Sequence, residues 1–139
     1  MKILFVCSGN TGRSPMAEFV MRKLVKDAGL SEKISVASAA SKPTDGGILH
    51  QGIAAKLRME NIPFESHFAR TITKADYDAS DLIVCMDEKS LNEVKNLIGD
   101  DKKLTKLLDK DIPWDKNAFM TTFDDVKRGC EALLEKIEV

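Results

Sequence analysis

The chain opens with a short apolar run that leads directly into a polar loop: KILFVCSGNTGRSPMAEFV, residues 2–20. Residues 3–6 are apolar, and residues 2–6 are typical of a short buried strand. Residues 7–14 carry polar side chains and two glycines, which predicts a loop. Ser14 is a residue type that caps helices, and Pro15 suits a first helical turn. This stretch therefore predicts a strand, a loop and a helix in immediate succession.

Strands and helices are predicted to alternate along the rest of the chain. Apolar residues recur at helical spacing after Pro15 until Gly29 ends the pattern. Further strands are expected near residues 34–37, 81–86 and 103–108, and further helices at residues 53–59, 88–98 and 123–137. Such alternation is typical of a parallel sheet covered by helices on both faces. We therefore predict one α/β domain over residues 1–139, with a central parallel sheet of four or five strands.

The composition narrows the class of protein. Of the 139 residues, 43% are hydrophobic and 31% are charged, and the formal net charge is -1. This is the balance of a globular protein, without a bulk field that would attract nucleic acid or an anionic membrane. The apolar run at residues 3–6 is too short for a signal peptide or a membrane span. We expect a cytoplasmic protein with neither a nucleic acid nor a membrane as its partner.

The cysteines indicate a reducing environment. The chain has three, Cys7, Cys85 and Cys130, at wide and unrelated spacings. An odd count in such a pattern fits neither a disulfide framework nor a zinc site. The sequence predicts no metal and no cofactor, and it leaves a cysteine free to act as a thiolate.

The loop after the first predicted strand combines the parts of an anion site. Cys7 begins it, Gly9 and Gly12 lie within it, and Arg13 follows six positions after the cysteine. The glycines let successive backbone N–H groups point inward, and the next helix adds the positive end of its dipole. Arg13 supplies a planar fork that can hold two phosphate oxygens, and these groups together favour the thiolate of Cys7. We call residues 7–14 the phosphate-binding loop.

Other interpretations of the phosphate-binding loop fit less well. A Walker loop requires Gly-Lys-Ser/Thr at its end, whereas this loop ends Gly12-Arg13-Ser14, and the Rossmann Gly-x-Gly-x-x-Gly spacing is absent. Cys7 could also be a buried strand-end cysteine and Arg13 a surface residue. The position between a first strand and a helix favours the functional interpretation.

The residues around the loop resemble a known family. Residues 6–18, VCSGNTGRSPMAE, closely resemble the N-terminal signature of the low-molecular-weight protein tyrosine phosphatases. The likeness runs nearly the whole chain, through Ser38-Ala39-Ala40, His67-x-Ala69-Arg70 and residues 81–87. The resemblance implies a cysteine-dependent protein phosphatase with a phosphocysteine intermediate. Its partners would be a phosphorylated protein and, in the loop, inorganic phosphate or another oxyanion.

The resemblance also implies a role for individual residues. Cys7 would be the nucleophile and Arg13 the phosphate clamp. The rest of the phosphate-binding loop would comprise Ser8, Gly9, Asn10, Thr11, Gly12 and Ser14. Asn10 and Ser14 would join Ser38 and His67 in a hydrogen-bond network that holds the loop, and Ser14 would also assist Cys7 as a leaving group. Asp87 is either a helix N-cap, which we favour, or a carboxylate that organises the site.

The chain departs from the family where the catalytic acid belongs. The family carries an Asp-Pro-aromatic loop near its C-terminus, whose aspartic acid protonates the leaving group. Residues 109–115 read DKDIPWD here, so aligning Pro113-Trp114 with the Pro-aromatic pair leaves Ile112 in place of the acid. We predict that Asp111, one residue earlier, takes this role; Asp109 and Asp115 lie nearby, and all three could instead be solvated loop acids.

Two departures in the loop bear on redox behaviour and substrate. Gly12 stands where many family members have a second cysteine, so a protective disulfide with the nucleophile is missing. Thr11 replaces a bulky aliphatic residue and resembles the bacterial protein-arginine phosphatases, so phosphotyrosine and phosphoarginine are both open. Residues 41–49 offer no aromatic wall, which leaves Trp114 as the candidate platform for the substrate.

Two rival functions share parts of this pattern. An arsenate reductase of the same fold would pass oxidation along further cysteines; Cys85 could be the second, but the third is missing from residues 88–98. A catalytically weak module that binds phosphate or phosphoproteins would keep Arg13 but would have no use for Cys7.

Overall fold

A parallel sheet forms the centre of the molecule. The structure is a computed structural model that describes residues 1–99, 102–113 and 119–137. Its sheet has four strands in the order β2-β1-β3-β4. The strands are β1 (Lys2–Cys7), β2 (Ser35–Ala40), β3 (Leu82–Cys85) and β4 (Leu104–Lys106). The strand prediction is confirmed in position, with β2 extending further than expected and β4 only three residues long.

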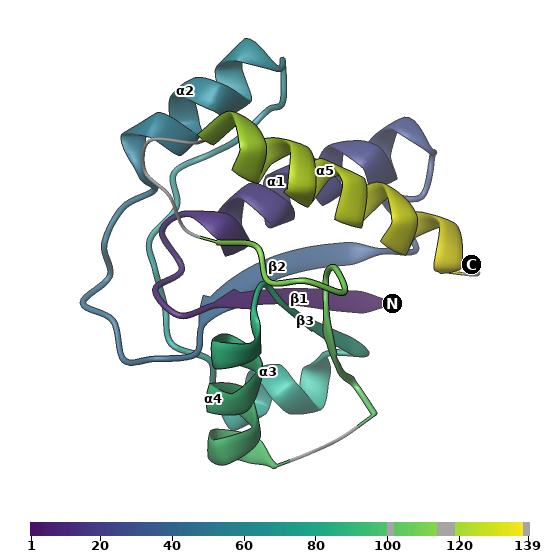
Figure 1. The fold of residues 1–139 in the computed structure, drawn as a ribbon. Coiled ribbons are helices and arrows are strands. Elements are labelled where there is room, and N and C mark those ends of the chain that lie inside the picture. Colours follow the sequence, from purple (N-terminus) through teal and green to yellow (C-terminus); the bar gives the residue numbers. More distant parts are fainter. Residues whose placement is uncertain (100–101, 114–118, 138–139) are drawn as a thin grey trace.

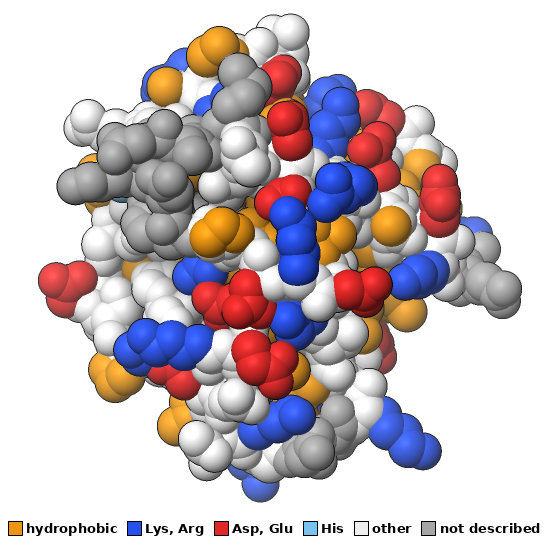
Figure 2. All heavy atoms as spheres, viewed as in Figure 1, with side chains coloured by type: hydrophobic (Ala, Val, Ile, Leu, Met, Phe, Trp, Pro, Cys, Tyr) orange, Lys and Arg blue, Asp and Glu red, His pale blue; other side chains and the backbone are white. Residues whose placement is uncertain are grey.

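Helices cover both faces of this sheet, as predicted. In Figure 1, α1, α2 and α5 lie on one side of the sheet, and α3 and α4 lie on the other. The helices are α1 (Arg13–Asp27), α2 (Gln51–Met59), α3 (Lys74–Ala79), α4 (Glu88–Ile98) and α5 (Phe119–Lys136). Among the described residues, no helix is both long enough and apolar enough to cross a membrane. Acidic and basic side chains are interleaved over the face that Figure 2 shows, in keeping with the small net charge.

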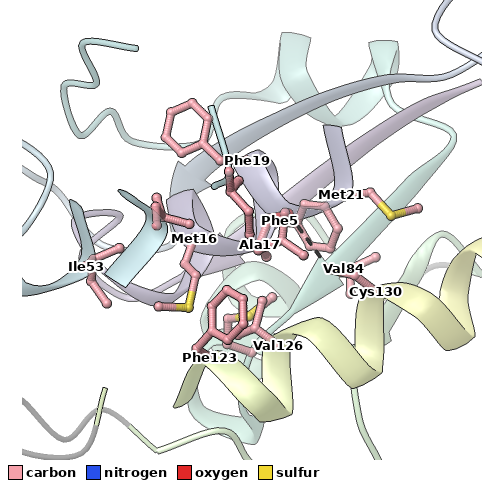
Figure 3. Packing of buried hydrophobic residues seen from close by; sticks show 14 of the residues in the cluster. Phe5, Met16, Ala17, Phe19, Met21, Ile53, Val84, Phe123, Val126 and Cys130 are labelled. Carbon is pink, nitrogen blue, oxygen red and sulfur yellow. Dashed lines mark hydrogen bonds between the residues drawn. The ribbon is translucent and has the colours of Figure 1, made fainter. Parts of the chain in front are cut away.

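Strand β1 builds the core because its side chains alternate between the two faces. Phe5, fully buried, packs among residues of α1, β3 and α5, including Met21, Val84 and Val126 (Figure 3). Leu4, also fully buried, belongs to the cluster on the opposite face. Burying each such side chain contributes roughly 1.5–3 kcal/mol. The core therefore fixes β1 in register, and with it the loop that follows.

The start of α1 corrects one expectation. We expected Ser14 to cap this helix, but the helix begins at Arg13, and Gly12 occupies the N-cap position without a side-chain hydrogen bond. Ser14 lies inside the first turn and is fully buried. Its hydroxyl is engaged with Cys7 and Asn10 instead, so it cannot serve as a cap.

The site lies at the carboxyl edge of the sheet. Residues Cys7 of β1 and Ala40 of β2 are register partners, and the Ser41 N–H donates to the Cys7 carbonyl at 3.0 Å. The end of β3 is tied in at the same edge, where the Met86 N–H donates to the Val6 carbonyl at 3.0 Å. Loops after parallel strands meet at this edge, which is where such sheets bind ligands.

Candidate active site

The phosphate-binding loop curls into a small hollow between β1 and α1. Cys7 is the last residue of β1 and Arg13 the first of α1, and both are buried. The hollow has a volume of about 210 Å³ and is lined by residues 7–13. The loop thus brings the predicted nucleophile and the predicted clamp to one cavity.

Two hydrogen-bond donors face the Cys7 sulfur. The Ser14 Oγ lies 2.9 Å from Cys7 Sγ, and the Asn10 backbone N–H donates to the same sulfur at 3.2 Å. Ser14 Oγ also accepts a hydrogen bond from Asn10 Nδ2 at 2.9 Å, so its own proton is available for the sulfur. These two contacts fix the position of the sulfur within the loop.

Asn10 is the residue around which the loop is organised. Its backbone is in the left-handed region, with φ of 59°, which costs energy unless the surroundings hold it. Its Nδ2 donates to Ser38 Oγ at 3.0 Å, its Oδ1 accepts from the Arg70 N–H at 3.1 Å, and its carbonyl accepts from His67 Nε2 at 2.8 Å. The structure thus gathers Asn10, Ser14, Ser38 and His67, the four residues expected to support the loop.

Glu18 extends this network, a role that sequence reasoning missed. It is buried on α1, and Ser38 Oγ donates to its Oε1 at 2.6 Å. Arg22, one turn further along the helix, pairs with its other oxygen. The carboxylate orients the Ser38 hydroxyl so that the Ser38 oxygen accepts from Asn10.

Arg13 is held from behind by two acceptors. Its Nη1 donates to Asp87 Oδ2 at 2.6 Å and to the Ile112 carbonyl at 2.7 Å. Asp87 also accepts from the Ser90 N–H at 2.8 Å, so the N-cap prediction is confirmed and the carboxylate touches the site as well. Burial tends to raise the pKa of Asp87, but hydrogen bonds from Ser90 and Arg13 outweigh it and lower the pKa overall.

The Ser8 side chain points to the neighbouring helix. Its hydroxyl donates to Glu93 Oε1 of α4 at 2.9 Å, and Ser41 Oγ donates to the same oxygen at 2.9 Å. Lys42 Nζ lies 3.5 Å from the other carboxylate oxygen. Ser8 therefore lines the hollow formed by residues 7–13, which we call the cradle, while its side chain fixes the loop to α4.

Thr11 forms the wall of the cradle on the side of α2. Its carbonyl accepts from the His50 N–H at 2.9 Å, and a Cβ placed on Gly47 would lie 3.4 Å from its methyl group. Beside it, Ile48 and Phe68 form a β-bridge, and both side chains are more than 60% exposed. Phe68 is an aromatic residue beside residues 41–49 that sequence reasoning missed, because tertiary pairing brings it there. Trp114, the predicted platform, lies outside the described residues.

Asp111 is occupied by contacts that do not favour a proton donor. Its Oδ1 lies 2.7 Å from Lys106 Nζ and accepts from the Glu88 N–H at 2.9 Å. The hydrogen bond from Lys106, and next that from Glu88, hold the pKa of Asp111 below its ordinary value. Of its two neighbours, Asp109 is exposed and Asp115 lies outside the described residues.

The two other cysteines are separated from the nucleophile. Cys85 is the register partner of Val6, so its side chain lies on the sheet face opposite to that of Cys7. Burial raises the pKa of Cys85 to about 12 and raises that of Cys130 as well. Both are buried thiols of low reactivity.

A parallel α/β sheet with a cysteine, an anion nest and an arginine at the end of its first strand defines a class of cysteine-based phosphatases. Comparison with known proteins makes the assignment specific. The model of the low molecular weight phosphotyrosine protein phosphatases matches residues 2–139, and the chain belongs to that family. It is thus an enzyme of the hydrolase class that acts on phosphoric monoesters.

Relatives from distant organisms share nearly the whole chain. The human low molecular weight phosphotyrosine protein phosphatase is 38% identical, over 96% of this chain and 94% of the relative. The low molecular weight protein-tyrosine-phosphatase YfkJ of Bacillus subtilis is 33% identical, over 99% of this chain and 96% of the relative.

Solved structures agree with the fold. The crystal structure of YfkJ matches with a TM-score of 0.89 at 34% identity, covering 99% of this chain and 94% of that one. The phosphatase SP-PTP of Streptococcus pyogenes matches with a TM-score of 0.90 at 29% identity, covering 99% and 93%.

Proposed function

We propose that this chain hydrolyses phosphotyrosine in proteins through a phosphocysteine on Cys7. The observation that carries the proposal is the Cys7 sulfur at the base of the loop, with the Ser14 hydroxyl and the Asn10 N–H directed at it. The names of relatives that are 33–38% identical support a tyrosine substrate.

The reaction would proceed in two displacements at phosphorus. In the first, Cys7 Sγ forms a bond to phosphorus as the bond to the tyrosine oxygen breaks, and that oxygen leaves with a proton. In the second, a water oxygen attacks phosphorus, the S–P bond breaks, and phosphate leaves while the thiolate returns. The Ser14 O–H would stabilise the thiolate as it departs.

Arg13 would clamp the phosphoryl group through its remaining edge. Both of its described hydrogen bonds use Nη1, which anchors the guanidinium to Asp87 and Ile112. We assign Nε and Nη2 to two equatorial oxygens, because a guanidinium presents these two donors in parallel. The loop N–H groups and the α1 dipole would bind the same oxygens.

The proton donor remains a prediction. Asp111 was the expected acid, but its pairing with Lys106 and the hydrogen bond from the Glu88 N–H disfavour its protonated form. Asp109 and Asp115 are the other candidates in this stretch. An acid at the leaving group typically contributes ~10²–10⁴-fold to the rate. Of Asp109→Asn and Asp115→Asn, the variant that removes the acid should therefore lose turnover by about this factor.

Phosphoarginine is a second candidate substrate, favoured by Thr11. Its side chain is smaller than the aliphatic residue of tyrosine-specific members, and it abuts Gly47, which has no side chain. We predict that Thr11→Ile lowers turnover of phosphoarginine peptides more than that of phosphotyrosine peptides. An equal loss on both peptides would contradict a selective role for Thr11.

The two rival functions find less support. The relay of an arsenate reductase needs cysteines that reach Cys7, and Cys85 points to the other sheet face. A binding module would not need the donors that face the sulfur.

We also infer a cytoplasmic location, since the three cysteines are unpaired.

The test is turnover of p-nitrophenyl phosphate by the wild type and by Cys7→Ser, with Cys85→Ala as the control. We expect full activity in the wild type and Cys85→Ala, and none in Cys7→Ser, which should still bind phosphate. A wild type without activity would refute the proposed phosphatase reaction. If the wild type reduced arsenate with thioredoxin and Cys85→Ala did not, the cysteine relay of an arsenate reductase would be favoured instead.

A further inference from the structure

The segment after β4 supports Arg13 through its main chain. Ile112 is fully buried, and both of its backbone groups are engaged. Its N–H donates to the Met86 carbonyl at 2.9 Å, and its carbonyl accepts from Arg13 Nη1 at 2.7 Å. A backbone carbonyl is thus one of the two anchors of the clamp, and its position depends on what holds this segment in place.

The preceding residue holds the segment. Asp111 Oδ1 accepts from the Glu88 N–H, at the first turn of α4, and pairs with Lys106 at the end of β4. Lys106 Nζ also lies 3.6 Å from Glu88 Oε2. We call Lys106, Glu88 and Asp111 the clasp. In Figure 2, acidic and basic side chains alternate over this region, between α4 and the segment that leads towards α5.

Both partners of Asp111 in the clasp suit a negatively charged side chain. A helix N-terminus and an ammonium group both favour the negative form of Asp111. The carboxylate is about half exposed, and such ion pairs add little to global stability. The effect of the clasp is therefore local: it fixes the residue next to the carbonyl that binds Arg13.

We propose that Asp111 is a positioning residue: clasped by Lys106 and the Glu88 N–H, it holds the Ile112 carbonyl against Arg13 and so orients the guanidinium for phosphate. This rests on the proposed function of the loop, and it replaces the role of proton donor that the sequence suggested. Small displacements of a clamp of this kind have large effects, since ~1 Å can cost about 100-fold in rate.

The test compares Asp111→Ala, Lys106→Met and the double variant. Exposed residues on other helices serve as matched controls, Asp78→Ala on α3 and Lys26→Met on α1. The readouts are KM and kcat for p-nitrophenyl phosphate and for phenyl phosphate, which has the poorer leaving group, across pH. Phosphate binding by calorimetry adds a readout that needs no turnover.

Each single variant should raise KM and weaken phosphate binding by roughly 3- to 10-fold, equally for both substrates, with the alkaline limb of the pH profile unchanged. The double variant should bind phosphate no more weakly than the more impaired of the two single variants, since the two residues act as one unit. The controls should match the wild type.

Two results would overturn the proposal. If Asp111→Ala lost kcat more on phenyl phosphate and removed the alkaline limb while Lys106→Met matched the wild type, Asp111 would be the acid. If Asp111→Ala and Lys106→Met both bound phosphate as tightly as the wild type, the clasp would have no role in positioning Arg13. A wild type without turnover would refute the proposed function, yet phosphate binding would still decide the positioning role.

Discussion

At the scale of single residues, the Asn10 amide organises the site. Ser14 Oγ accepts from Asn10 Nδ2, so the Ser14 proton is directed at the Cys7 sulfur. Ser38 is oriented in the same way by Glu18, because its hydroxyl donates to the carboxylate and leaves its oxygen for Asn10. Both hydroxyls accept from the Asn10 amide, so the donor direction diverges from Asn10: through Ser38 to Glu18, and through Ser14 to the Cys7 sulfur.

This donor direction predicts the behaviour of Ser14→Ala. The departing thiolate would lose its hydroxyl donor, so breakdown of the phosphocysteine should slow by ~10–100-fold and become rate-limiting. Stopped-flow turnover by Ser14→Ala should then show a burst of the first product. The control Ser35→Ala, at an exposed serine of β2, should give the same time course as the wild type. A fall in kcat without a burst would show that Ser14 acts elsewhere.

Asp87 predicts how stability changes with pH. Its pKa is lower in the folded than in the unfolded chain, because the hydrogen bonds from Ser90 and Arg13 outweigh burial. Its contribution is therefore complete above the ordinary aspartate range and is lost as the pH falls through the folded pKa. Thermal unfolding should show Asp87→Asn less stable than the wild type at pH 7, with the gap narrowing towards pH ~3. A gap that stayed constant or widened on acidification would contradict this.

At the scale of elements, α4 supports the cradle from two sides. Its N-cap, Asp87, anchors Arg13, while Glu93 in its second turn binds the hydroxyls of Ser8 and Ser41. The first-turn N–H of Glu88 meanwhile anchors the segment that carries Ile112. A rotation or shift of α4 would therefore disturb both ends of the phosphate-binding loop.

Glu93→Ala tests this support. Two hydroxyls would lose their acceptor, which should lower the free energy of unfolding by about 1–2 kcal/mol and weaken phosphate binding several-fold. Urea denaturation and phosphate inhibition of turnover are the measurements, with Glu135→Ala on the exposed face of α5 as the control. If phosphate inhibited Glu93→Ala as strongly as it inhibits the wild type, Ser8 would not need this anchor.

At the scale of the whole molecule, the alternation of β1 decides the fold. Phe5 and Cys7 face the layer of α1 and α5, and Leu4 and Val6 face that of α4. We expect Phe5→Ala to cost ~3–5 kcal/mol of unfolding free energy in urea, against little change for Ile48→Ala, whose side chain is 63% exposed. A loss below 1 kcal/mol would contradict the central place of Phe5 in the core.

The sequence revealed the parts that depend on local pattern. The apolar runs of β1 and β3 and the loop between β1 and α1 follow from residue types alone. Helix α3 was missed because it buries no side chain, and its only signal is the capping box of Thr73 and Asp76. The Ser14 cap was wrong because the curled loop turns the Ser14 hydroxyl towards Cys7 and Asn10. The Asp111 contacts were unforeseen because tertiary packing brings the first turn of α4 to this residue.

The most direct test of the account is to trap the phosphoenzyme. Wild-type protein mixed with p-nitrophenyl phosphate and quenched in acid should carry one phosphoryl group, located on Cys7 by mass spectrometry, and Ser14→Ala should accumulate more of it. An unmodified Cys7 during full turnover, or undiminished turnover by Cys7→Ser, would contradict the mechanism.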